Sequence, residues 1–295
     1  MNFQKFQATA GVHLCTMLFG LSAVLADGLQ ASASAIVAGR AVWAVLTLSL
    51  VLLCLRGKHR QSLSARSLLH YGLNGVLLAG HWLCFFTGVE QGGVAVGTLG
   101  FACFPVFVSI LGRLFFATPI SGRNIGAMLL VAAGLYIISP GETQALYSTS
   151  ALLWALAAGL SYAIIVLYNK HIDTSGSPLV SAWFQCLACA LVTLPWGYSA
   201  LSLSEATDFI NILLIGVLCT GLAYSLLTFA LKNINASKAA IIISLEPLWA
   251  ILFAALLYRS LPDSQTLFGG AFILSAVIIS ALPQAEKRGA VTPRA

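Results

Sequence analysis

Apolar residues fall into long runs along this chain, and short polar breaks separate the runs. A helix needs about 20 apolar residues to cross the roughly 30 Å hydrocarbon core of a bilayer. The runs have about that length, so the pattern predicts an all-α polytopic membrane protein with ten transmembrane helices. We place these spans at residues 8–26, 33–55, 67–89, 92–116, 122–139, 149–169, 178–198, 208–231, 236–258 and 264–282.

The composition excludes a soluble globular domain. Hydrophobic residues make up 59% of the chain and charged residues only 8%, whereas roughly 25% of the residues in a typical soluble domain are charged. The seven cysteines lie in or at the ends of apolar runs, where they pack as small hydrophobic side chains. We therefore expect no disulfide framework, no metal and no cofactor.

The net charge of +6 belongs mainly to the loops. If the N-terminus is cytoplasmic, every loop cation except Arg259 falls on the cytoplasmic side of the membrane. Cytoplasmic loops of membrane proteins carry an excess of Lys and Arg. The distribution therefore predicts a multi-pass protein with both termini in the cytoplasm, and it explains the basic charge without a nucleic-acid partner.

The second half of the chain repeats features of the first half. Gly80 is matched by Gly221 at an offset of 141, and Pro105 is matched by Pro247 at an offset of 142. Each half holds five spans, an odd number, so the second repeat must be inverted in the membrane relative to the first. Inverted repeats place a binding site near the bilayer midplane and let it open alternately to each side. We assign residues 1–143 to the first five-helix repeat, 144–284 to the second, and 285–295 to a cytoplasmic tail.

The apolar run from Ala236 to Tyr258 contains one acid, Glu246, followed by Pro247. As a single helix it would be about 35 Å long, with Glu246 near its middle. A charged side chain at that depth costs at least about 2.5 kcal/mol, and Pro247 leaves the carbonyl of Ile243 without its helical donor. These features predict a site inside the bundle. The alternative is an uncharged structural Glu that bonds to a neighbouring helix in a kinked span.

Several short motifs stand out along the chain, namely Phe19-Gly20-Leu21-Ser22, Arg40, Phe104-Pro105, Glu246-Pro247, Gly126 to Gly134 and Gly269-Gly270. In this order and spacing they give the chain a resemblance to the drug/metabolite transporter superfamily, specifically to its bacterial EamA-type members with two five-span repeats. The resemblance implies a transporter in the bacterial inner membrane that exports amino acids or other small metabolites. Many such relatives have a Gly-Glu pair after spans four and nine, and this chain departs from that pattern with Phe116-Ala117-Thr118 and Tyr258-Arg259-Ser260.

Polar and aromatic residues recur at helical spacing inside six of the spans, which indicates faces turned away from lipid. The resemblance assigns a central cavity to the same spans, and aromatic walls with a few polar groups suit a small amphipathic molecule. The substrate-binding candidates are His13, Thr16, His81, Phe85, Phe101, Trp154, Ser161, Tyr224, Glu246 and Trp249.

Some of these residues have a structural alternative. His13 and His81 could be interior histidines with satisfied hydrogen bonds, and Trp82, Trp154 and Trp249 could be core or membrane-interface aromatics. Arg40 could pair with carbonyl groups or with Glu246, or it could fix the packing of the second span, which is the role that we favour from the sequence.

The function expected from these observations is transport of a small-molecule substrate by alternating access through a central cavity in the lipid bilayer. A non-catalytic membrane scaffold or assembly subunit is the alternative. A membrane-embedded enzyme is less favoured, because the sequence has no paired acids and no H-E-x-x-H motif. We therefore expect no catalytic residues, and the sequence indicates no oligomeric state.

Overall fold

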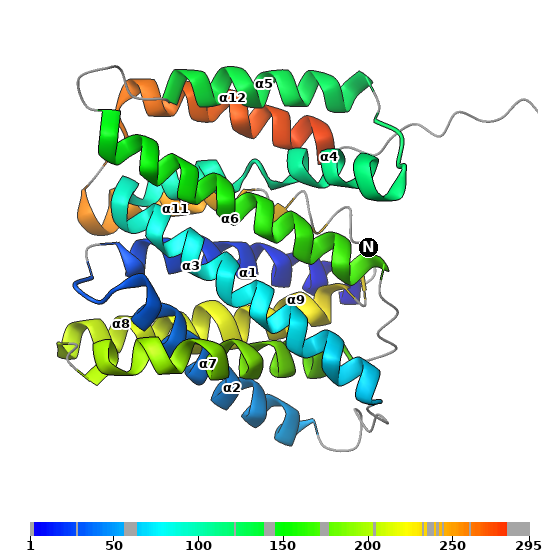
Figure 1. Ribbon diagram of the computed structural model, residues 1–295, viewed down its shortest axis with the longest axis vertical. Coiled ribbons are helices and arrows are strands. Elements are labelled where there is room, and N and C mark those ends of the chain that lie inside the picture. The colour runs from blue at the N-terminus through cyan, green and yellow to red at the C-terminus, as the bar shows by residue number, and fades with distance from the viewer. Residues whose placement is uncertain are drawn as a thin grey trace, which may run out of the picture.

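The computed structural model is built from helices packed side by side (Figure 1). It describes residues 3–27, 29–55, 64–120, 122–138, 145–171, 177–202, 205–231, 233–234, 239, 242–243, 245–259 and 261–281. Within these residues six helical segments are long and apolar enough to cross a membrane, and four shorter helices are also apolar. The predicted class, an all-α polytopic membrane protein, is confirmed.

The helices of the first half are α1 (Phe3–Ala26), α2 (Ala33–Cys54), α3 (Ala65–Phe101), α4 (Phe104–Phe116) and α5 (Gly122–Ile138). Those of the second half are α6 (Ala145–His171), α7 (Pro178–Ser202), α8 (Ala206–Gly216), the π-helix η1 (Val217–Leu222), α9 (Ala223–Leu231), α11 (Glu246–Tyr258) and α12 (Ser264–Ala281). The boundary predicted at 143/144 and the tail at 285–295 lie outside the described residues, and both stay predictions.

Helices α4 and α11 are counterparts in the two halves. Each has 13 residues, has a proline in its first turn, and lies at an offset of 142 from the other. Each also ends at a residue in the left-handed conformation, Ala117 or Arg259, both with φ 52°. The two repeats therefore share detailed backbone features as well as helix number.

Those two left-handed residues coincide with the departure noted in the sequence. Left-handed backbone is the conformation that glycine adopts without a steric penalty. Here Ala117 and Arg259 occupy the turn, and the end of α4 is closed by the Thr118 N–H, which donates to the Gly112 carbonyl at 3.2 Å. Each turn therefore has a conformational cost that a glycine would not have.

Spans four and nine are interrupted helices, which the apolar pattern did not predict. Span four starts inside α3 after Gly93, whose φ of 73° breaks the helical dihedrals, and it is interrupted again at Ala102 and Cys103 before α4 begins. In span nine, Leu245 is not helical and α11 begins at Glu246. The expectation of one continuous helix from 236 to 258 is therefore wrong, because the proline cannot donate the hydrogen bond that would continue it.

The bundle has two outer helix pairs with a central group between them. Helices α5 and α12 pack together along one edge, α2 and α7 along the opposite edge, and α3 and α6 run side by side across the middle (Figure 1). The largest apolar cluster joins α1, α2, α3 and α7, while a separate cluster joins α5 and α12 to the end of α3. The interrupted helices contribute to these clusters, and α11 packs against α1 and α3.

Candidate functional site

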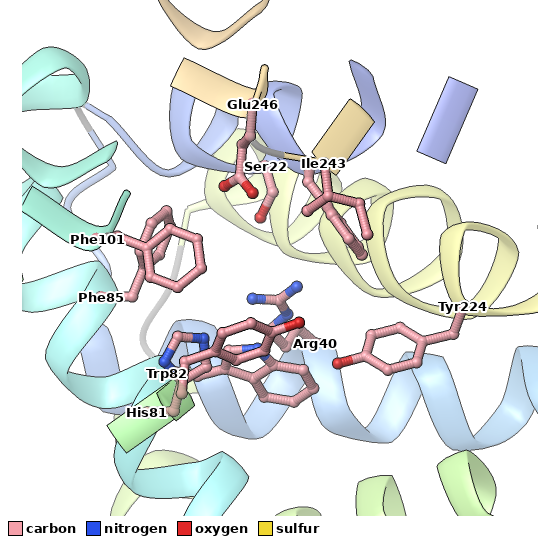
Figure 2. Close-up of a pocket in the computed structure, with 11 residues that line it drawn as sticks. Ser22, Arg40, His81, Trp82, Phe85, Phe101, Tyr224, Ile243 and Glu246 are labelled. Carbon is pink, nitrogen blue, oxygen red and sulfur yellow. The ribbon is translucent and has the colours of Figure 1, made fainter. Parts of the chain in front are cut away.

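A cavity lies where residues from both halves converge (Figure 2). Its volume is about 50 Å³. The first half contributes side chains from α1, α2 and α3, and the second contributes side chains from α6, α9, α11 and the segment before α11. The lining residues are Phe19, Ser22, Arg40, His81, Trp82, Phe85, Phe101, Tyr162, Tyr224, Ile243 and Glu246.

Both helix interruptions border this cavity. Phe101 is the last residue of α3, and Glu246 is the first residue of α11. Glu246 is buried, and its carboxylate points toward the cavity beside Ser22 (Figure 2). Irregular backbone within a membrane is tolerated where it lines a cavity inside the protein, and here the two breaks bring a ring and a carboxylate to the same space.

Gly20 allows α1 to approach the start of α11. A Cβ atom at this position would lie 2.8 Å from the Ala250 nitrogen and 3.0 Å from the Glu246 carbonyl oxygen. Both distances are shorter than ordinary van der Waals contacts, so only glycine lets the two helices pack this closely. The close approach explains why glycine stands between Phe19 and Ser22, the two α1 residues that line the cavity.

Aromatic rings form one wall of the cavity. The centroid of the Phe101 ring lies 5.4 Å from that of His81, 5.6 Å from that of Phe85 and 5.4 Å from that of Tyr162. These separations are typical of edge-to-face and offset ring pairs, which stabilise beyond simple burial. The wall is therefore a packed apolar surface suited to the hydrocarbon part of a ligand.

The His81 ring is held by backbone. Its Nδ1 donates to the Ala158 carbonyl of α6 at 3.0 Å, because a carbonyl oxygen can only accept. The Ser161 hydroxyl lies behind it, 3.5 Å from Nδ1, and donates to the same carbonyl at 2.9 Å. His81 thus ties α3 to α6 while its ring faces the aromatic wall.

Arg40 supplies a positive charge to the cavity. Its Nε donates to the Thr220 hydroxyl oxygen at 3.0 Å, and its guanidinium carbon lies 4.1 Å from the centre of the Trp82 ring. Among the described residues no carboxylate lies within the 4.0 Å of an ion pair with Arg40, and this includes Glu246. The ion pair between Arg40 and Glu246 that the sequence suggested as one alternative is therefore absent here. The group that accepts a hydrogen bond from Arg40 is the Thr220 hydroxyl and not a carbonyl.

The structure brings together half of the residues proposed from the sequence. His81, Phe85, Phe101, Tyr224 and Glu246 line the cavity. The remainder lie elsewhere: His13 and Trp249 are half-buried, Thr16 donates to the Val12 carbonyl, Trp154 is 41% exposed, and Ser161 lies behind His81. The lining residues missing from the sequence-based set are Phe19, Ser22, Arg40, Trp82, Tyr162 and Ile243.

Comparison with known proteins identifies the family. The chain matches the EamA-like transporter family twice, over residues 10–139 and again over residues 149–282. It is a member of that family. The two matches agree with two repeats, and the protein is accordingly a multi-pass membrane transporter with a small-molecule substrate.

Individual relatives give the same result. The chain is 22% identical to YxxF, an uncharacterized transporter of Bacillus subtilis, over 94% of this chain and 90% of that protein. It is 26% identical to YwfM, another uncharacterized transporter of the same organism, over 73% and 74% of the two chains. A solved crystal structure with 14% identity superposes with a TM-score of 0.62 over 92% of this chain and 96% of that one, which supports the fold.

Proposed function

We propose that this EamA-like protein exports small amphipathic metabolites, such as amino acids, from the bacterial cytoplasm by alternating access through the cavity. The observation that carries the proposal is the lining itself, in which an aromatic wall is combined with one buried guanidinium and one buried carboxyl group from opposite halves of the chain. Such a set can bind a molecule that has both charged groups and an apolar side chain. The site residues, the inner-membrane location and the cytoplasmic termini are parts of the same proposal.

The cavity is small, as expected for a transporter whose site widens only when it opens to one side of the membrane. A volume of about 50 Å³ is smaller than most amino acids require, so binding needs the walls to move apart. Because the lining comes from both repeats, a rocking motion of one repeat against the other would change the cavity directly.

Glu246 has a defined part in this proposal. Its carboxylate can bind the cationic amine of a substrate or take up a proton during the cycle. Glu246→Gln keeps the shape and most of the hydrogen-bonding capacity of the side chain but removes its charge and its titration. We expect normal expression, stability close to wild type, and flux that is both low and insensitive to pH.

The test is flux of radiolabelled amino acids into liposomes that contain the purified protein. Glu90→Gln is the matched control, because Glu90 is an exposed acid on α3 that does not line the cavity. A growth-rescue screen with toxic amino acids and analogues in an exporter-deficient bacterium identifies the compounds to label. Wild-type flux and an unchanged pH profile in Glu246→Gln would return Glu246 to a structural role.

A further inference from the structure

Arg40 is deeply buried for a residue that carries a permanent charge. Its side chain is 3% exposed, and the residues before and after it on α2, Gly39 and Ala41, are also buried. It lies about 10 Å along the axis from the start of α2. A charged side chain inside a membrane protein is costly and normally faces a partner or a polar cavity, so its surroundings indicate what it is for.

Among the described residues, the hydrogen bond of Arg40 uses the Nε side of the guanidinium, and no hydrogen bond is made by its Nη atoms. Nε donates to Thr220, and one face of the group lies over Trp82. A guanidinium has five N–H donors, four of them on the two Nη atoms. Figure 2 shows these Nη atoms directed into the cavity toward the wall that holds Ser22 and Glu246. The edge with the Nη atoms is the one that binds a carboxylate through two parallel hydrogen bonds.

Thr220 determines the orientation of the Arg40 guanidinium, because its hydroxyl oxygen accepts from Nε. It lies in the π-helix η1, and its hydroxyl donates to the carbonyl of Ile215 at 2.9 Å while its oxygen accepts from Arg40 Nε. Gly216 lets η1 approach α2, because a Cβ there would lie 2.4 Å from the Trp43 Cβ and 2.9 Å from the Arg40 carbonyl oxygen. Isolated π-helical turns are frequent at functional sites, and here the turn delivers a hydroxyl to the side of the guanidinium.

Ser22 gives an independent indication of a polar ligand. Its side chain is 3% exposed, its hydroxyl has no hydrogen-bond partner in the described structure, and it lines the same cavity. Buried hydroxyl groups are nearly always hydrogen-bonded in native proteins. An unpartnered hydroxyl facing free Nη donors across a small cavity indicates a site that is completed by a bound molecule.

We propose that the Nη atoms of Arg40 bind a carboxylate of the transported molecule, that Ser22 contacts the same molecule from the opposite wall, and that Thr220 is the residue that positions Arg40. The inference rests on the proposed transport function and deepens it, because it makes a carboxylate a requirement for recognition. It differs from a packing role for Arg40, in which the arginine would matter equally for every transported compound.

The experiment compares amino acids with their amides, which lack the carboxylate and keep the amine and the side chain. The probes are L-leucine, L-phenylalanine and L-threonine with the corresponding amides, and flux is measured in liposomes. Hydrogen bonds to charged groups predict that wild-type protein moves an acid about tenfold to a hundredfold faster than its amide. In Arg40→Gln the flux of the acid should fall to that of the amide, and the flux of the amide should change little.

Thr220→Val tests positioning with an isosteric change. It should raise the KM for the acid by about threefold to tenfold, leave the amide unaffected, and be rescued by Thr220→Ser. Thr193→Val is the matched control, because the buried Thr193 hydroxyl on α7 donates to the carbonyl of Cys189 in its own helix and does not line the cavity.

Each outcome separates the two proposals. Equal flux of acid and amide in the wild type would overturn the assignment of Arg40 and leave transport intact. Equal losses for acid and amide in Arg40→Gln would give Arg40 a packing role only. If Arg40→Gln does not fold, an unchanged KM for the acid in Thr220→Val overturns the positioning role. A wild type that moves no acid and no amide would overturn transport of these molecules and with it this inference.

Discussion

Replacing Gly20 by alanine tests whether the contact between α1 and α11 builds the cavity wall. The added Cβ would meet the Ala250 nitrogen at 2.8 Å, and the Glu246 oxygen and the Trp249 Cβ at 3.0 Å. None of these atoms can rotate away, because they belong to backbone or to a Cβ. Ordinary contact begins near 3.5 Å, so the helices must separate by about 0.7 Å. Overpacking of this kind typically costs about 1–3 kcal/mol.

Gly80→Ala is the matched control for this substitution. Gly80 is also a glycine within a membrane-spanning helix, and a Cβ there would meet nothing within 4 Å. Both variants gain the same helix propensity, about 1 kcal/mol in water-based scales. The difference in unfolding free energy between them should therefore be about 1–3 kcal/mol, with Gly20→Ala the less stable.

The assay is reversible unfolding of both variants in mixed micelles, followed by flux in liposomes on the same preparations. Gly20→Ala should lose stability and also lose flux, because moving α1 away from α11 displaces Ser22 and Glu246 relative to each other. Equal unfolding free energies for the two variants would refute the reasoning that this glycine is required by close packing.

Three further predictions concern the loops and the helix ends. Arg259→Gly should raise the unfolding free energy by up to about 1 kcal/mol, since left-handed backbone costs a non-glycine residue about 1–2 kcal/mol; an unchanged or lower value would contradict this. Asp263→Ala should lower stability at pH 7 by about 1 kcal/mol, because the carboxylate accepts from the Thr266 N–H at 2.6 Å at the start of α12. That hydrogen bond lowers the pKa of Asp263 from 3.8, so the difference between variant and wild type should be present above about pH 4 and shrink as the pH falls below it; a difference that does not change with pH would argue against the bond. Cysteines introduced at Asn2 and Gln144, both outside the described residues, should label from opposite sides in a cysteine-free variant, and equal labelling by an impermeant maleimide applied outside cells would contradict the predicted topology.

The class of fold could be predicted from the sequence because membrane burial imposes a simple pattern. Every span needs an apolar run of a fixed length, and that requirement survives any detail of packing. The breaks in spans four and nine are different, because they depend on the backbone dihedrals at Gly93 and Leu245. A proline predicts that a hydrogen bond is lost nearby, but it does not say whether the helix bends or stops.

The lining of the cavity could be predicted only in part, because helical spacing defines a face to within about one residue. On α6 the sequence favoured the face with Trp154 and Ser161, yet Tyr162, one position further, is the residue that lines the cavity. On α3, His81 and Phe85 of the predicted face line the cavity, and so does Trp82 beside them, whose role the sequence left open. Which neighbour faces inward depends on how far each helix is rotated by its packing, and apolar periodicity does not determine that rotation.

The separation of Arg40 from Glu246 bears on how such a site can both bind and release a charged molecule. Breaking a buried ion pair by removing one partner costs about 3–5 kcal/mol, so a direct pair would have to be opened before any substrate could bind. In this structure Arg40 is held instead by a neutral hydroxyl and an aromatic face, and Glu246 stands on another helix beyond ion-pair distance. The guanidinium and the carboxyl group are thus not held by each other. Because Arg40 and Glu246 belong to opposite repeats, a relative movement of the repeats would change the distance between them. In the proposed transport cycle, a molecule bound to both residues would be held tightly in one arrangement and released in another.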